Sequence, residues 1–222
     1  MSIVDWIFPR VCVGCGREGK YICRECEQKL TRPPAICPGC CKPSLGGWVH
    51  GRCKTEWGME RLMVGLPYRG PVQKLLKKVK YGSAWEIVQA LFEIWISRTE
   101  NPELKERGVV TSVPMYRQKE RERGFNQAEV LAKLLAENYK VPYLTILERK
   151  RETKPMFGLS RKERRENVGG AFRVINQQTN ELTDKRIILV DDVWTTGATM
   201  RECTRVLKRA GAEEVWGVTL AR

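Results

Sequence analysis

The segment from Ile187 to Thr199 constrains the fold more than any other part of this 222-residue chain. It opens with four apolar residues, Ile187 to Val190, as expected of a parallel strand that is buried on both faces. Two acids and a loop of hydroxyl residues and glycine follow, and a helix is predicted from about Thr199 to Ala210. In open α/β sheets, ligands bind beyond the carboxyl ends of such strands. The segment therefore predicts an α/β sheet with a ligand site at this turn.

The residues of this turn indicate a site for a sugar phosphate. A helix start offers free backbone N–H groups and the positive end of the helix dipole, and both attract phosphate. Gly197 permits close backbone approach. We expect Thr199 and Glu202 to form a capping box. No Gly-Lys-Ser/Thr follows, so the loop is not of the P-loop type. The expected phosphate-binding residues are Thr195, Thr196, Gly197, Ala198 and Thr199.

The two adjacent carboxylates, Asp191 and Asp192, complement this loop. They would repel a phosphate but can accept hydrogen bonds from the hydroxyl groups of a ribose. Strand, acids and Thr-Thr-Gly-x-Thr loop together resemble the signature of the type I phosphoribosyltransferases. The resemblance implies that the acids bind the ribose hydroxyls of phosphoribosyl pyrophosphate, held with Mg²⁺, and that the loop holds its 5-phosphate. In such an enzyme, positioning and electrostatics can suffice without a side-chain nucleophile.

The remainder of residues 61–222 alternates between strand and helix patterns. Strands are predicted near residues 109–113, 145–147, 171–175 and 215–220, and helices from Pro71 to Gly82, over 84–96 and after Asn126. This alternation favours an open, mostly parallel sheet with crossover helices. No apolar stretch is long enough to span a bilayer, and the N-terminus lacks the features of a signal peptide. We therefore expect a cytoplasmic protein.

Two basic segments are further candidates for anion binding. The first, residues 115–125, is expected as a loop that binds pyrophosphate or DNA through Arg117, Lys119, Arg121 and Arg123, although Glu120 and Glu122 also fit a solvated charge run. The second, residues 149–167, is expected as a long polar loop. Type I phosphoribosyltransferases have a mobile loop at this place that covers the substrate, and a plain basic surface loop is the alternative. Its candidate residues are Lys154, Arg161 and Arg165.

Eight of the nine cysteines lie before residue 54, and seven of these, together with His50, form four Cys-x-x-Cys or His-x-x-Cys pairs. In a reducing cytosol this clustering indicates metal rather than disulfides, and the spacing lets paired side chains turn toward one tetrahedral Zn²⁺. Sequential ribbons are the first expectation, although a cross-brace also satisfies the sequence. Cys41 is left over and Cys203 is expected in the core. Residues 1–60 are thus predicted to form a module with two structural zinc sites, whose ligands are Cys12, Cys15, Cys23, Cys26, Cys37, Cys40, His50 and Cys53.

Further motifs are similar to those of the ComF/ComFC competence-protein family. They are Lys80–Gly82, Arg123–Gln127, Leu159–Asn167 and Ala171–Phe172, and the similarity extends to the cysteine module. Met156 stands where family members often have glutamine. The resemblance implies a cytosolic protein that is linked to natural transformation and handles incoming single-stranded DNA.

Three functions are compatible with these patterns. The net charge of +14 favours anionic partners. We rank first a competence protein that binds phosphoribosyl pyrophosphate and single-stranded DNA, with Tyr116, Phe125 and Trp194 near the basic loops. Packing is the alternative for these aromatic residues, and it fits Phe125 best. The second is a metabolic phosphoribosyltransferase that acts on a nucleobase or another acceptor. The third is an adaptor that recruits a helicase or other DNA-processing protein through the zinc module.

Overall fold

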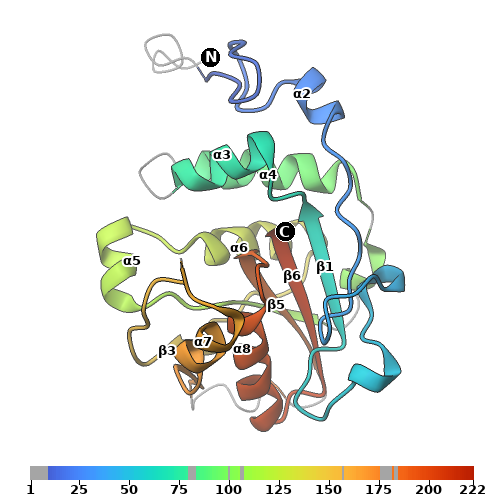
Figure 1. The fold of residues 1–222 in the computed structure, drawn as a ribbon, viewed down its shortest axis with the longest axis vertical. Helices are drawn as coiled ribbons and strands as arrows, with labels where there is room; N and C mark the ends of the chain where they lie inside the picture. The colour runs from blue at the N-terminus through green and yellow to red at the C-terminus, as the bar shows by residue number, and fades with distance from the viewer. Residues whose placement is uncertain are drawn as a thin grey trace.

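A four-stranded parallel sheet forms the centre of the computed structural model, which describes residues 10–79, 84–99, 101–105, 108–156, 158–175, 182 and 185–222. The strand order is β1-β6-β5-β2, and every neighbouring pair is parallel (Figure 1). The strands are β1 (Arg61–Leu66), β2 (Gly108–Ser112), β5 (Arg186–Val193) and β6 (Glu214–Ala221). The predicted α/β class and its parallel sheet are confirmed.

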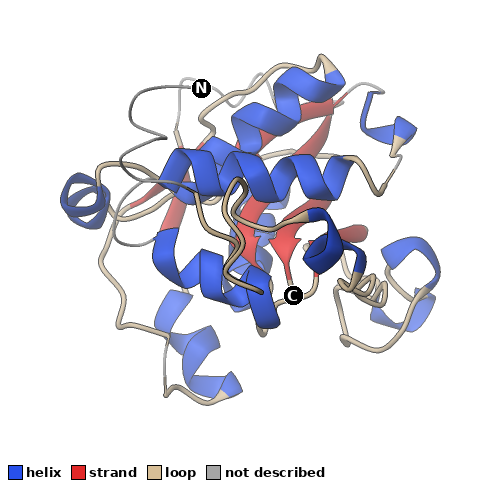
Figure 2. Cartoon of the chain, turned by 90° about the horizontal axis from the view of Figure 1, so that it is seen from above, coloured by secondary structure: helices blue, strands red, loops and turns tan. Residues whose placement is uncertain are grey.

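Helices cover both faces of this sheet (Figure 2). On one face, Ile188 and Val190 of β5 join a core built with helices α3 (Gly70–Lys78), α4 (Ala84–Ile96) and α6 (Gln127–Tyr139). On the other face, Ile187 and Leu189 pack with α8 (Ala198–Arg209). Successive strand side chains point to opposite faces, so the apolar run at the start of β5 supplies both cores. Cys203 of α8 is fully buried, as predicted.

The segment expected as a basic loop at residues 115–125 instead contains helix α5 (Arg117–Arg123). The Gln118 amide donates to the Glu122 carboxylate one turn later, at 3.1 Å. Gly124 ends the helix in the left-handed conformation, with φ of 84°. The alternating charges that suggested a solvated loop are therefore the surface of a short exposed helix.

The long polar stretch at residues 149–167 also contains a helix. It is α7 (Arg161–Val168), which begins with a capping box between Ser160 and Glu163. The flanking strands β3 (Leu147–Arg149) and β4 (Phe172–Val174) pair antiparallel as a separate two-stranded sheet. The expected long loop is thus a helix carried by a hairpin.

The cysteine-rich segment contains α2 (Arg24–Gln28) and the short 3₁₀ turns η1 (Leu45–Gly47) and η2 (Gly51–Cys53), and a further turn, η4 (Pro102–Lys105), precedes β2. Its first part packs with the core that contains α3, and its second part runs beside β1 (Figure 1). The Lys80–Gly82 motif, the predicted helix end at Gly82 and the N-terminal segment to residue 9 lie outside the described residues. Among the described helices, none has the length and apolar character needed to cross a membrane.

Candidate functional site

The carboxyl end of β5 carries Asp191 to a small hollow at the start of α8. The hollow is lined by Asp191, Met156, Val193 and the residues from Trp194 to Met200. Asp192 does not line it, because neighbouring strand residues point to opposite sides. The Asp192 N–H donates to the Asp191 carboxylate at 2.9 Å, and the Val193 N–H donates to the Asp192 carboxylate at 2.7 Å. The structure thus brings one of the two predicted acids to the predicted loop.

Gly197 gives the loop its shape. It precedes the first residue of α8 in the left-handed conformation, with φ of 74°, and no side chain caps the helix there. A Cβ atom at this position would lie 2.3 Å from the ring of Trp194, which is 2% exposed and packs directly beneath the loop. The first N–H groups of α8 therefore face the hollow without a side-chain acceptor, as an anion site requires.

The predicted capping box between Thr199 and Glu202 is wrong. Helix α8 begins at Ala198, so Thr199 already lies inside the helix rather than at its cap. The Glu202 carboxylate instead accepts the N–H of Gly170 at 2.7 Å and two hydrogen bonds from Arg205. Glu202 therefore ties α8 to the end of α7.

Burial raises the pKa of Asp191 well above its ordinary value of 3.8, and the negative charge of Asp192 raises it further. The Arg149 guanidinium lowers it in part. A carboxyl that is desolvated in this way gains most from a partner that donates hydrogen bonds, such as a ribose hydroxyl.

We expect the Asp191→Asn substitution to raise the melting temperature at neutral pH. Because its pKa is raised, the Asp191 carboxyl group binds its proton more tightly in the folded protein than in the unfolded chain. The free energy of unfolding therefore falls as the pH rises from about 4 through the pKa of Asp191 in the folded protein. Asparagine keeps the shape and removes the charge. Thermal unfolding at several pH values from 4 to 8 should show a gap in favour of the variant that widens with pH, and parallel curves would contradict the expectation.

Three further residues lie at the site although sequence analysis did not place them beside the phosphate loop. Arg164 of α7 donates to the Thr195 hydroxyl at 3.2 Å, which fixes the loop to the hairpin. Met156 lines the hollow and accepts a contact from the Asn167 amide at 3.7 Å. Arg201 donates to the carbonyl oxygen of Thr196 at 3.0 Å. Of the three, only Met156 stands out in the sequence, because members of the ComF/ComFC family often have glutamine at this position.

The four predicted basic residues of the first segment do not converge on one point. Arg117 and Arg121 line a groove of about 530 Å³ against the β3–β4 hairpin, together with Tyr116. Lys119 pairs with Glu152 at 3.0 Å, and the Arg123 guanidinium donates to Gln127 at 3.0 Å. Two of the four basic residues therefore face one groove, and the other two are engaged in separate side-chain contacts.

The other predicted surface residues also separate. The backbone of Lys154 exchanges two hydrogen bonds with the Asn167 amide, at 3.0 and 2.9 Å, while Arg161 and Arg165 are exposed on α7. Trp194 is buried and cannot stack with a base, so its predicted contact with single-stranded DNA is wrong and the packing alternative holds. Phe125 is partly buried and packs against the core, which confirms packing rather than DNA contact for this residue.

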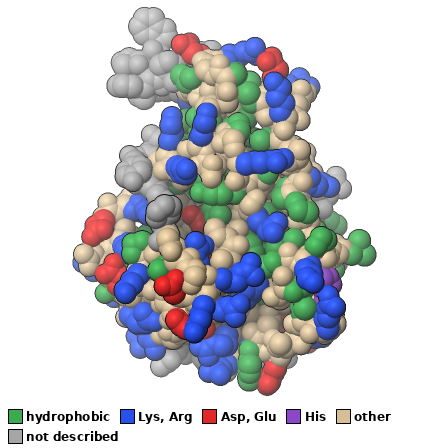
Figure 3. All heavy atoms as spheres, viewed as in Figure 1, with side chains coloured by type: hydrophobic (Ala, Val, Ile, Leu, Met, Phe, Trp, Pro, Cys, Tyr) green, Lys and Arg blue, Asp and Glu red, His purple; other side chains and the backbone are tan. Residues whose placement is uncertain are grey.

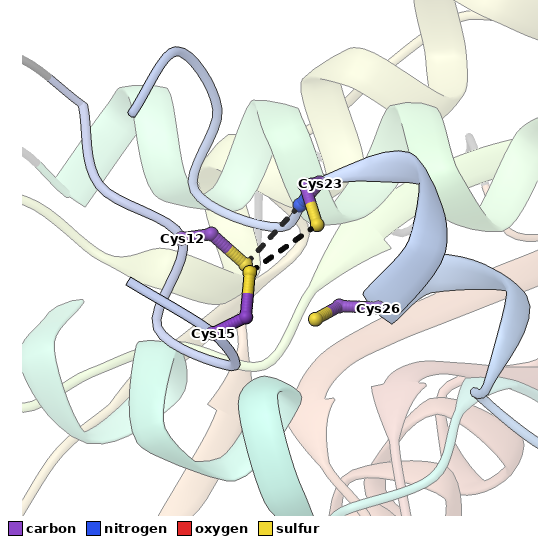
Figure 4. Close-up of side chains that lie close together, drawn as sticks. All are labelled: Cys12, Cys15, Cys23 and Cys26. Atoms are coloured by element: carbon purple, nitrogen blue, oxygen red, sulfur yellow. Dashed lines mark hydrogen bonds between the residues drawn. The ribbon is translucent and has the colours of Figure 1, made fainter. Parts of the chain in front are cut away.

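The predicted metal ligands come together in two sequential clusters. The first comprises Cys12, Cys15, Cys23 and Cys26, whose side chains turn toward one another (Figure 4), and the second comprises Cys37, Cys40, His50 and Cys53. Within each cluster, all ligand atoms lie within 4.8 Å of one another. Sequential ribbons are thereby confirmed over the cross-brace, and the described cysteines form no disulfide.

The surroundings of both clusters suit Zn²⁺ with four sulfur ligands or three sulfur and one nitrogen ligand. In the first cluster the Cys23 N–H donates to the sulfur of Cys12, at 3.3 Å. Burial acts to raise the pKa of Cys12, but hydrogen bonds from Cys23 and neighbouring backbone N–H groups lower it to about 6, so the thiolate form that binds metal is favoured. In the second cluster, His50 Nδ1 lies 3.4 Å from the Cys40 sulfur, while Nε2 lies 3.1 Å from the Pro43 carbonyl oxygen. That outer contact fixes the ring orientation.

Arg201 joins the second cluster to the phosphate loop. Its guanidinium donates to the carbonyl oxygens of Pro38, at 2.6 and 2.8 Å, and of Gly39, at 3.2 Å. Both residues lie in the turn between Cys37 and Cys40. The same guanidinium also reaches Thr196, and Cys41 accepts a contact from it at 3.3 Å. Cys41 is thus outside the cluster, as expected, and lies beside this arginine.

Comparisons with known proteins agree with this arrangement. The family model of the phosphoribosyl transferase domain matches residues 122–222, and that of the double zinc ribbon domain matches residues 3–54. Competence protein F of Haemophilus influenzae is 31% identical over 212 residues, which cover 90% of each chain. DNA utilization protein YhgH of Escherichia coli K12 is 29% identical over 88% of each chain. Competence protein ComFC of Bacillus subtilis is 28% identical over 90% of this chain and 84% of its own. The chain therefore belongs to the ComF family of competence and DNA-utilization proteins, in which a phosphoribosyltransferase domain follows a double zinc ribbon.

Proposed function

We propose that this protein binds phosphoribosyl pyrophosphate with Mg²⁺ and handles single-stranded DNA during DNA uptake, in the cytoplasm. One observation carries the first part. Asp191 and an uncapped helix start share one hollow, so a hydrogen-bond acceptor for a sugar lies beside a binding site for its phosphate. Residues 1–60 would act as the zinc-binding module and residues 61–222 as the phosphoribosyltransferase domain.

In this proposal each part of the site has one task. Asp191 and Asp192 accept hydrogen bonds from the ribose hydroxyls. The backbone and hydroxyl groups of Thr195–Thr199 hold the 5-phosphate, with Arg164 fixing the position of Thr195. Mg²⁺, when bound, would neutralise the pyrophosphate. The two cysteine clusters bind structural Zn²⁺ and leave no open metal position for catalysis. The residues proposed to bind pyrophosphate or DNA are Arg117, Lys119, Arg121 and Arg123, and those proposed to cover the site are Lys154, Arg161 and Arg165.

The DNA role is supported by charge and by relatives. The net charge of +14 predicts affinity for a phosphate backbone, and such affinity falls steeply with salt. The relatives named competence and DNA utilization proteins span at least 84% of their own length in the match. A helicase or other DNA-processing protein is the partner that we propose for the zinc-binding module.

Calorimetric titration with phosphoribosyl pyrophosphate and Mg²⁺ tests the first part. We expect binding by the wild-type protein and at least tenfold weaker binding by the Asp191→Asn/Asp192→Asn double variant, since hydrogen bonds to a charged acceptor contribute about 1.5–3 kcal/mol each. Glu137→Gln, an exposed acid on α6, serves as the control. Equal affinity of the double variant and wild type would remove the proposed role of the acids. Release of pyrophosphate in the presence of nucleobases would instead favour a metabolic phosphoribosyltransferase.

A further inference from the structure

A cleft of about 460 Å³ lies between the second metal cluster and helices α7 and α8. The cleft is lined by residues 38–59 of the zinc-binding module, by residues 198–205 of α8 and by Arg165 and Val168 at the end of α7. Ala198 lines both this cleft and the phosphate hollow, so the two adjoin at the first turn of α8. The acids Asp191 and Asp192 do not line the cleft, which therefore adjoins the proposed phosphoribosyl site but does not include its ribose-binding acids.

The interior of the cleft is apolar and includes one accessible aromatic ring. Met59, Val168 and Ala198 line it and are each less than a tenth exposed. Trp57 also lines it but remains 38% exposed. The Arg209 guanidinium lies 5.6 Å from the centroid of the Trp57 ring, so one face of the ring is already in a cationic environment. An exposed tryptophan in an apolar cleft is a surface on which a planar ring can stack.

The charged residues that line the cleft are predominantly positive. They are Arg165, Arg201 and Arg205, with Glu202 as the one acid among them. The Glu202 carboxylate already accepts hydrogen bonds from the Arg205 guanidinium and the Gly170 N–H, with donor–acceptor distances of 2.6 to 2.8 Å. The space-filling view shows Lys and Arg side chains gathered over the lower half of this face, where α7 and α8 lie (Figures 1 and 3). The cleft therefore offers net positive charge beside an apolar interior.

We infer that this cleft binds an unpaired base of single-stranded nucleic acid, with the base stacked on Trp57 and the adjoining phosphate near Arg165. Stacking on an aromatic ring within a cationic groove is how proteins hold single strands without reading their sequence. A duplex does not fit the same chemistry, because its bases are stacked on one another. The inference rests on the proposed DNA role and adds the place where a strand would contact the protein.

Binding of a fluorescent oligo-deoxythymidine, measured by anisotropy on the full zinc-loaded chain, tests the inference. We expect Trp57→Leu to weaken binding about tenfold or more, since stacking contributes about 1–3 kcal/mol per base. Trp57→Phe should retain most of the affinity. Trp85→Leu is the matched control, because Trp85 is 49% exposed on α4, away from the cleft. Zinc content verifies that each variant keeps its ribbons.

A second pair of variants separates phosphate contact from general charge. Arg165→Gln should lower the slope of log affinity against log salt by about 1, while Lys162→Gln, on the same helix but outside the cleft lining, should leave it unchanged. Equal strand binding by wild type and Trp57→Leu would overturn the inference and leave the proposed DNA role standing. No strand binding by the wild type would overturn both. Unchanged affinity of Trp57→Leu for phosphoribosyl pyrophosphate is expected, and a parallel loss would show that the cleft belongs to the phosphoribosyl site.

Discussion

Replacement of Gly197 by alanine should lower the affinity for phosphoribosyl pyrophosphate at least tenfold and lower stability by about 2–4 kcal/mol. Two separate costs combine. The φ of 74° disfavours any residue with a Cβ atom, and that atom would lie 2.3 Å from the Trp194 ring. The ring is buried and cannot move outward without opening the core. The loop must shift instead, and the N–H groups at the start of α8 would then lose their common direction.

Gly170→Ala provides the matched control for this prediction. Gly170 has a similar φ of 64°, but a Cβ atom added there would meet no other atom within 4 Å. This variant has the backbone cost alone, about 1–2 kcal/mol. Chemical denaturation and calorimetric titration of both variants separate the two costs. Equal losses in the two variants would show that the contact with Trp194 is not important for the loop.

Removal of metal from the second cluster should weaken phosphoribosyl pyrophosphate binding about tenfold or more, whereas removal from the first should not. The link is Arg201, whose guanidinium holds Pro38 and Gly39 of the metal-binding turn and Thr196 of the phosphate loop together. Without metal, the turn has little core of its own and loses its shape. Arg201 would then lose its acceptors at Pro38 and Gly39, and a half-buried charge that lacks hydrogen-bond partners costs about 1–3 kcal/mol.

The two clusters make this test internally controlled. Cys40→Ser disrupts the second cluster and Cys15→Ser the first, and zinc content measures each loss. Affinity for phosphoribosyl pyrophosphate and amide hydrogen exchange of residues 195–198 provide two readouts, and the second does not depend on ligand. In an Arg201→Ala background, Cys40→Ser should cause little further change. Equal effects of Cys40→Ser and Cys15→Ser would show that the metal sites act only on overall stability.

Local patterns predicted the parts of the site that are local in the chain. The strand, the acids and the glycine turn from Ile187 to Thr199 follow one another in sequence, so periodicity and turn chemistry locate them. The metal ligands were equally accessible, because two-residue spacing within each pair reflects the geometry of a tetrahedral ion. Helices α5 and α7 were missed because their charged surfaces gave no apolar stripe.

The remaining features depend on contacts between distant segments. Arg201 meets Pro38 across 163 positions of sequence, and nothing near either residue indicates the pairing. Trp194 stands beside a hydroxyl-rich loop and so resembled a stacking residue, but the Gly197 turn leaves room for it only beneath the loop. The cleft beside Trp57 exists because two separate segments are packed against α8. Such features follow from the tertiary fold rather than from any local pattern.

The order of the strands has a consequence for protein synthesis. Strand β6 lies between β1 and β5, so β1 has no place in the sheet until β6 has left the ribosome. Residues 67–213, most of the chain, are made between the end of β1 and the start of β6. A chain that stalls before Glu214 would therefore expose the apolar edge of β1 to chaperones and proteases. Completion of the sheet, and with it of the ligand site, therefore waits until β6 has been made, long after β1.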